Sequence, residues 1–220
     1  RQIVIWAYNG IKEAYGLDKP LVVQYFLYLK NLAVFDWGRS FTSSQPVIDI
    51  MAYRFWNTIF LMGAAMCFVL VAGTGLGMVM AWRRGGPLDT GGTVMALVFQ
   101  SAPPFVTGLL LLMVLSYRLD LFPTGGMHAA GVSIGKGLGV FLSADFLHHL
   151  VLPTITVALY YLATPMLIMR DSMLEVMGSD FIELAKAKGL APHVVMIKHA
   201  ARNALMAVVT VSSLMVGFAI

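Results

Sequence analysis

The side chains best suited to chemistry in this sequence are three histidines in or near residues 118–146. His128, His148 and His149 accompany a glycine-containing segment, and Asp145 is the acidic residue closest to them. Imidazole and carboxylate groups are common metal ligands, so two adjacent histidines invite a metal-binding interpretation. No further carboxylate or thiolate cluster stands at ligand spacing, however. The pattern therefore favours structural or interfacial histidines, and the sequence assigns no metal ligand.

Nucleotide hydrolysis and acyl transfer have no recognisable machinery in the chain. A phosphate-binding loop needs the spacing G-x-x-x-x-G-K-[ST], which the Gly135–Lys136 pair lacks. No Ser-His-Asp set and no pair of carboxylates can be singled out either. The one cysteine, Cys67, lies in an apolar run and has no partner for an internal disulfide. The chain is therefore predicted not to be an enzyme and to hold no cofactor.

The composition places the chain in a membrane. Of the 220 residues, 59% are hydrophobic and 12% are charged, with a mean hydropathy of +0.79, whereas a soluble domain carries about 25% charged residues. The net charge of +4 and the pI near 9.3 could indicate nucleic acid. The basic residues instead cluster beside apolar stretches, as membrane-topology signals do: Arg83, Arg84, Arg170, Lys186, Lys188, Lys198 and Arg202. We expect lipid as a partner and no nucleic acid.

Four apolar stretches contain no Asp, Glu, Lys or Arg, and a membrane helix needs roughly 20 such residues. They cover residues 55–82, 93–117, 149–169 and 204–220. The basic clusters place residues 180–203 in the cytoplasm, and residues 118–146 then face outward. Residues 1–54 lack a long uncharged window and are predicted to be an extracytoplasmic or interfacial segment, followed by a transmembrane domain over residues 55–220. The uncharged spans also argue against a proton- or sodium-coupled carrier.

The second apolar stretch contains the best candidate for a translocation path. Gln100 and Ser101 are followed closely by Pro103 and Pro104. Two consecutive prolines remove two backbone donors and must kink or open a helix, which a membrane tolerates only where the freed carbonyls face protein or water. A kink that merely improves packing is the alternative. By contrast, Gly73 and Gly77 form a small-xxx-small pair, for which helix packing is the favoured role.

The long polar stretch at residues 180–203 predicts two short helices joined by a corner. Good helix formers run from Asp180 to Lys188, with Ser179 or Asp180 available to cap the start and Gly189 placed to end the helix. Pro192 falls in the first turn of the second helix, where its missing N–H does no harm. A compact knob between two membrane spans is expected.

This stretch resembles the EAA motif of permease subunits from ABC importers, through Glu183, Leu184, Ala185 and Gly189. More narrowly, ELAKAKGL followed by KHAARNAL is similar to permeases of the dipeptide, oligopeptide and nickel type. Leu184 replaces the alanine that is usual there, and Met206 stands where the family often has proline. Two further patterns fit the resemblance: Ser101, Pro103 and Phe105, and the run from Arg170 to Glu175.

The resemblance implies an all-α, polytopic transmembrane bundle of the type I importer kind, located in the cell inner membrane. Family members usually have six membrane helices, so the first helix and most of the last third are expected to lie outside this sequence. The implied partners are a homologous second permease, two cytoplasmic ATPases that bind ATP and Mg, and a solute-binding protein. The implied coupling residues, which would contact an ATPase, are Glu183, Leu184, Ala185, Gly189, Leu190 and Pro192.

The function predicted from the sequence is therefore a permease subunit of an ATP-driven importer, with ATP hydrolysis in separate chains. Two alternatives stay open: a secondary transporter or channel that uses the proline-broken helices, and a membrane redox subunit that uses His148 and His149. Peptides are the largest substrate class among chains of this pattern. Nickel, glutathione and oligosaccharides are handled by similar chains, and the sequence does not choose among them.

Overall fold

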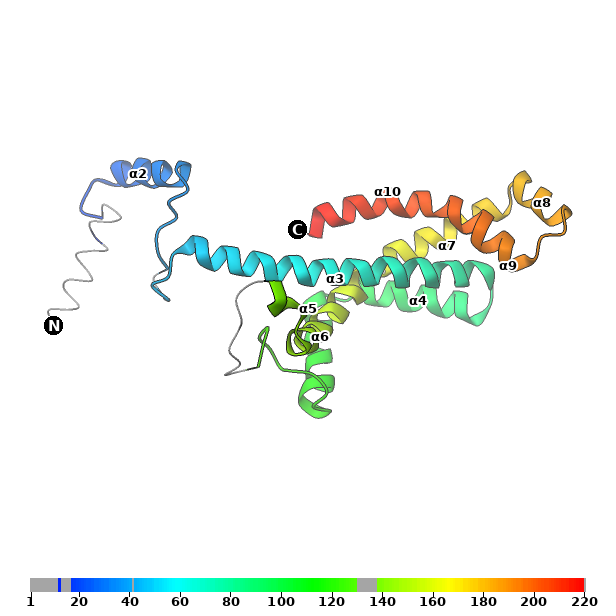
Figure 1. Ribbon diagram of the computed structural model, residues 1–220, viewed down its shortest axis with the longest axis horizontal. Coiled ribbons are helices and arrows are strands. Elements are labelled where there is room, and N and C mark those ends of the chain that lie inside the picture. Colours follow the sequence, from blue (N-terminus) through cyan, green and yellow to red (C-terminus); the bar gives the residue numbers. More distant parts are fainter. Residues whose placement is uncertain (1–11, 13–16, 41, 130–137, 220) are drawn as a thin grey trace. The chain divides into compact units, whose positions relative to one another are not determined.

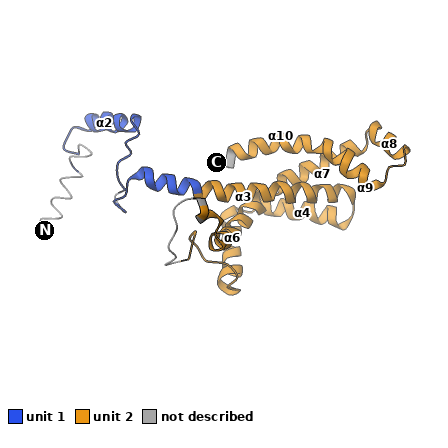
Figure 2. Cartoon of the chain, viewed as in Figure 1, with its two compact units in different colours: residues 1–56 blue, residues 57–220 orange. Residues whose placement is uncertain are grey.

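The computed structural model of the protein is all-helical, apart from turns, loops and an isolated bridge between Arg39 and Pro46, over the residues it describes: 12, 17–40, 42–129 and 138–219. This confirms the predicted all-α class. The chain divides into two compact units, residues 1–56 and residues 57–220 (Figure 2). The division into a segment 1–54 and a membrane domain 55–220 stays a prediction. The Gly135–Lys136 pair lies outside the described residues.

The first unit contains helix α2, Leu21–Ala33, which has no buried residue. Pro20 precedes its first turn, and the Gln24 side chain donates a hydrogen bond to the Lys19 carbonyl at 2.8 Å. After α2 the chain turns at Phe35 and at Gly38, both with positive φ, and the Asp36 carboxylate accepts a bond from the Gly38 N–H at 3.1 Å. These local bonds define the turn without an apolar core.

Helix α3, Val47–Trp82, has 36 residues and is the longest helix of the described chain (Figure 1). Hydropathy predicted a start at Phe55, so the helix begins eight residues earlier than expected. The additional turns carry Asp49 and Arg54, and these charges end an apolar window without ending a helix. Residues 47–54 contain no glycine or proline, which leaves the backbone free to continue the helical hydrogen bonds.

Two glycines let α3 approach helix α7, Ala163–Met177, very closely. A Cβ added at Gly73 would lie 2.9 Å from Pro165 Cγ, and one added at Gly77 would clash with the Met166 carbonyl oxygen. Both glycines are buried. The expected packing role of this pair is confirmed, because the missing side chains are what allow the two helices to touch.

Both of the next two helical stretches are broken. Helix α4, Pro87–Ser101, is followed by α5, Pro104–Leu111, and the π-helical segment η1, Leu112–Arg118, with a bend of 104° at the break. Helix α6, Ala144–Tyr161, and α7 meet at a bend of 46°. These breaks agree with the prolines at 103–104 and at 165. Pro153, by contrast, was expected to break its span and lies within α6, so the loss of one helical hydrogen bond there does not end the helix.

The remaining elements are the 3₁₀ turn η2, Leu138–Leu142, and four helical segments that close the chain. These are α8, Asp180–Ala187; α9, Pro192–Val194; π-helical η3, Val195–Ala201; and α10, Arg202–Ala219. In the described chain, residues 47–82 and 192–217 are each long and apolar enough to cross a membrane, and the count rises to four if each bent pair is one span.

The largest buried cluster of the second unit joins the ends of several helices. It brings α7, α8, η3 and α10 together with the last turn of α3, at the end of the unit where Figure 1 shows α8 and α9. Its buried members are Ala81, Met169, Met173, Ile182, Ala185, Val195, Ala200, Ala201, Ala204 and Val208. A smaller cluster joins α3, α4 and α7 through Met80, Ala96, Ala163 and Met166. Helix α7 therefore takes part in both.

The glycine packing predicts a contrast between two positions on α3. Gly77→Ala should destabilise the protein by about 1–3 kcal/mol, the usual cost of forcing an extra methyl group into a packed contact. Gly75→Ala places its methyl group in open space and should leave stability unchanged or slightly raised. The midpoint of thermal unfolding in detergent checks both variants. Equal midpoints for the two would contradict the proposed close contact between α3 and α7.

Candidate functional site

Helix α8 forms at the start of the predicted cytoplasmic loop because its charges suit a helix. Asp180 and Glu183 lie in the first turn and Lys186 in the last, so each charge complements the helix dipole. Ser179 is the N-cap residue by position, as predicted, but its hydroxyl donates to the Val176 carbonyl at 2.5 Å and makes no capping bond to α8. The capping role expected of that side chain is therefore wrong, since the hydroxyl completes the end of α7 instead.

One face of α8 is anchored to the membrane helices. Ile182 is fully buried and Ala185 nearly so, and their spacing of three residues puts both on the same side of the helix. They pack in the cluster that contains Met169 and Met173 of α7. Ala185, one of the six predicted coupling residues, thus lies against its own chain. In this position it holds α8 in place.

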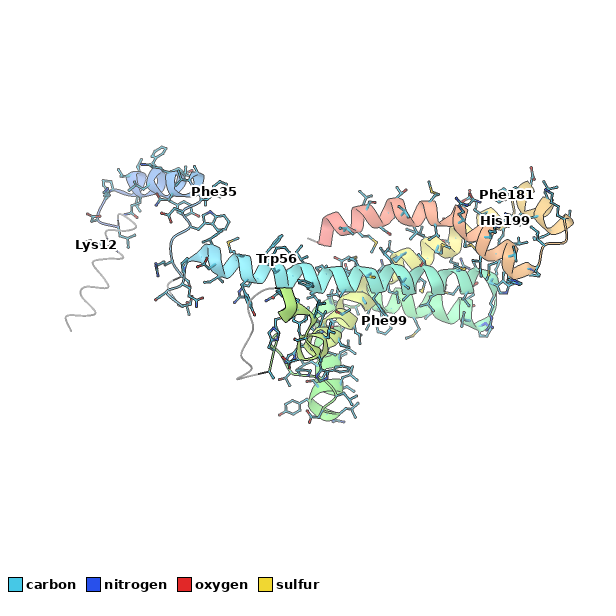
Figure 3. All side chains as sticks on the ribbon, in the orientation of Figure 1. Lys12, Phe35, Trp56, Phe99, Phe181 and His199 are labelled. Carbon is cyan, nitrogen blue, oxygen red and sulfur yellow. The ribbon has the colours of Figure 1, made fainter. Side chains whose placement is uncertain are left out.

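The opposite face of α8 is exposed and partly apolar. Leu184 is 56% exposed and Phe181 is 44% exposed, and Glu183 is also at the surface. Figure 3 shows Phe181 on α8 at the same end of the second unit as His199. Sequence reasoning named Glu183 and Leu184 and missed Phe181. The sequence spacing could have identified Phe181, since an aromatic residue three positions before Leu184 shares a helix face with it.

The corner after α8 is a fixed backbone turn. Gly189 has a φ of +75°, which costs glycine little and a residue with a side chain considerably more. Its N–H bonds to the Lys186 carbonyl at 2.9 Å, and the Leu190 N–H bonds to the Ala185 carbonyl at 3.4 Å. These two bonds make the Schellman pattern that ends many helices. Pro192 is then the first residue of α9, so both features of the predicted corner are confirmed.

The four residues of the predicted path lie at the break between α4 and α5. Gln100 and Ser101 end α4, Pro103 precedes α5 and Pro104 begins it. Neither proline has an N–H group, so the carbonyls four residues earlier lose their helical donors. The Gln100 amide nitrogen donates to Thr164 Oγ1 at 3.4 Å, which places this break beside the break between α6 and α7. Polar groups therefore gather where two broken helices meet.

A partly buried ion pair that the sequence did not reveal joins the start of α4 to α7. Arg170 Nε donates to Asp89 Oδ1 at 2.5 Å, and Arg170 Nη2 donates to Asp89 Oδ2 at 3.0 Å. The Asp89 side chain is 6% exposed and that of Arg170 is 24% exposed. The two residues are 81 positions apart, so no local pattern pairs them. Sequence reasoning used Arg170 as a topology signal and as part of the family resemblance, and did not pair it with Asp89.

Two of the three histidines considered as metal ligands, His128 and His149, lie beside the same carboxylate. Asp145 lies 3.3 Å from His128 Nδ1 and 3.5 Å from His149 Nδ1, and the His148 ring contacts the Leu121 carbonyl at 2.9 Å. His128 also packs beside Phe146, which is fully buried. Among the described residues, no three His, Cys, Asp or Glu side chains come together as a metal site would require.

Comparisons with known proteins show which family the chain matches. Residues 73–220 match the family described as binding-protein-dependent transport system inner membrane component. The chain is 35% identical over 205 residues to the oligopeptide transport system permease protein of Bacillus subtilis, and 35% identical over 204 residues to the dipeptide transport system permease protein of the same organism. It is 34% identical over 209 residues to the glutathione transport system permease protein of Pectobacterium atrosepticum.

These alignments take in most of this chain and a smaller part of each relative. They cover 93%, 92% and 94% of the chain, in the same order, and 63%, 61% and 62% of the relatives. The chain therefore spans less than two thirds of the length of the curated relatives it matches.

The anchoring of α8 predicts opposite behaviour for two aliphatic residues on the same helix. Ile182→Ala should lower the free energy of local opening of α8 by about 2–5 kcal/mol, because it empties a fully buried site. Leu184→Ala removes a side chain that points away from the core. This variant should change the free energy of local opening of α8 by less than about 0.5 kcal/mol. Amide hydrogen exchange of residues 180–187 in detergent measures both. Equal protection in the two variants would show that α8 is not held through Ile182.

Proposed function

Because the chain belongs to the family of binding-protein-dependent transport system inner membrane components, we propose that it is a permease subunit of an ATP-driven importer. It sits in the cell inner membrane as a multi-pass protein and forms part of the translocation path. The observation that carries the proposal is the knob of residues 180–192, in which one face of α8 is buried against the chain and the other is exposed.

The exposed face of α8 suits a protein partner. An apolar patch of Phe181 and Leu184 beside charged Glu183 combines a contact that excludes water with one that can choose a basic partner group. We assign this face, with Leu190 and Pro192 at the corner, to a groove on a cytoplasmic ATPase. ATP and Mg are bound and hydrolysed by such partner chains. A homologous second permease and a solute-binding protein complete the importer.

The corner at Gly189 makes the knob suitable for transmitting force. Its two backbone hydrogen bonds and the proline that follows leave little freedom between α8 and α9. Closure of the ATPases on ATP therefore displaces the knob as a body, and the buried cluster passes that displacement to α7 and α10. A flexible tether would lose the same displacement before it reached the membrane.

The translocation path runs beside the two broken helices. Gln100, Ser101, Pro103 and Pro104 present an amide, a hydroxyl and backbone carbonyls without helical donors, and the Thr164 hydroxyl lies within reach. These are acceptors and donors that match peptide N–H and C=O groups. Peptides, or a related small solute such as glutathione, are the substrates this set fits best. The names of the relatives support the same class.

Three substitutions at Gly189 separate backbone strain from partner contact. A side chain there meets nothing within 4 Å in this chain, but φ of +75° strains most residues. Asparagine tolerates that φ, so Gly189→Asn should retain most of the substrate-stimulated ATPase activity. In Gly189→Ala the backbone strain costs about 1 kcal/mol, and the stimulated ATPase activity should fall a few-fold. Gly189→Trp should abolish stimulation and transport, because its bulk meets the docked ATPase.

The measurement is the ATPase rate of the purified complex with and without the substrate-loaded binding protein, using glutathione and a defined tripeptide as probes. Membrane insertion and the recovery of each chain, checked by mass spectrometry, serve as controls. A Gly189→Trp complex with full activity would show that the corner does not face the ATPase. Purification without any ATPase chain would favour a carrier or channel instead.

A further inference from the structure

The ion pair between Asp89 and Arg170 is the best-defined polar contact inside the second unit. Both carboxylate oxygens accept bonds from two different nitrogens of the guanidinium group, at 2.5 and 3.0 Å. A two-bonded arrangement of this kind fixes the distance between the groups and also their relative orientation. A contact between two apolar side chains would leave the helices free to slide or rotate against one another.

The surroundings of Asp89 tie three elements to this point. The Gly85 N–H donates to Asp89 Oδ2 at 2.9 Å, so the turn between α3 and α4 is held by the same carboxylate. Asp89 itself stands in the first turn of α4. The third Arg170 contact, from Nη1 to Asp171 Oδ1 at 2.7 Å, is different in kind, because the Asp171 side chain is 68% exposed. An exposed pair contributes little, so Asp171 offers a matched control.

Arg170 lies where the buried cluster beneath α8 meets the ion pair. Its neighbour Met169, and Met173 one turn later, are fully buried against Ile182 and Ala185 of α8. Asp89, on the other side of the pair, begins the helix that ends at the break before Pro103. A continuous set of contacts thus runs from α8, through the buried cluster that it shares with η3 and α7, to α4 and its break.

Burial sets how firmly this contact resists separation. The Asp89 side chain is 6% exposed and that of Arg170 is 24% exposed. Separating them would leave the buried carboxylate without its charged partner, which opposes any movement that pulls the groups apart. A displacement of α7 is therefore passed to the start of α4, because the alternative is a separated and poorly hydrated pair. A buried apolar cluster also joins α4 and α7, through Met80, Ala96, Ala163 and Met166.

We propose that Asp89 and Arg170 are positioning residues that transmit the movement of α8 to α4 and thereby change the helix break at Pro103 and Pro104. This proposal rests on the proposed function, since it requires that α8 be moved by an ATPase. It assigns the pair a task that neither the coupling knob nor the residues at the break perform. The pair acts through the two helices and does not contact the transported solute.

The test reports the helix break directly and needs no identified substrate. Phe105, which is 70% exposed at the start of α5, is replaced by cysteine in a Cys67→Ser background. The complete importer, in lipid vesicles, is labelled with a water-soluble maleimide in the absence of nucleotide and in the presence of ATP and vanadate. We expect the labelling rate to differ about tenfold between the two states, within the usual range for coupled sites.

Substitutions of the pair should remove this response while the complex stays assembled. In Asp89→Asn and in Arg170→Gln, the two labelling rates should agree within about twofold, far below the usual coupling range. Asp171→Asn should keep the full difference, since it removes only the exposed contact. Arg170→Lys keeps the charge and loses the two-bonded geometry, so an intermediate response is expected. Recovery of the ATPase chains with each variant is measured alongside.

The outcomes distinguish a failure of the proposed link through Asp89 and Arg170 from a failure of the proposed importer function. A full response in assembled Asp89→Asn or Arg170→Gln overturns the link. If neither variant assembles, Arg170→Lys decides: a reduced response supports the link, whereas a full response or a failure to assemble assigns the pair to fold stability alone. No response in the parent protein and in Asp171→Asn would count against the ATP-driven function, and the link would fail with it.

Discussion

The structure depends most on the burial of Ile182 and Ala185 beneath α8. Without these two side chains the polar loop would be a solvated connection between membrane helices, with nothing to fix its orientation. With them, α8 joins the cluster of Met169 and Met173 and becomes an extension of α7. The exposed face of α8 is then held at a fixed angle to the membrane helices. A surface presented in this way can both receive a partner and pass on its movement.

A second constraint comes from the membrane, where each backbone polar group needs a partner. Consecutive prolines at 103 and 104 each lack an N–H at the break between α4 and α5, and the structure places this break beside a second one at Leu162. Irregular backbone at membrane depth is tolerated where it is buried in protein or lines a polar cavity. At the second break the Leu162 N–H bonds to the Ala158 carbonyl at 2.8 Å and the Leu162 carbonyl accepts from the Met166 N–H at 3.3 Å, so the backbone there stays paired.

Features set by a few neighbouring residues could be predicted from the sequence, and those set by distant contacts could not. Gly189 and Pro192 predicted the corner because positive φ and a missing N–H are local properties. The burial of Ala185 needed the position of α7, which no local pattern supplies. Asp89 and Arg170 were missed since each looks like an ordinary charge at the end of an apolar stretch. The early start of α3 at Val47 was missed because hydropathy detects membrane depth, and helices extend beyond it.

The central claim is that the exposed face of α8 docks on an ATP-hydrolysing chain. A photoreactive phenylalanine analogue at Phe181 tests it most directly, since this side chain is already aromatic and at the surface. Irradiation of intact cells, followed by mass spectrometry, should yield a covalent adduct with an ATPase subunit. The same analogue at Tyr117, which is exposed at the far end of the α4–α5–η1 stretch, should yield none. An absence of ATPase adducts at Phe181, with the complex intact, would contradict the account.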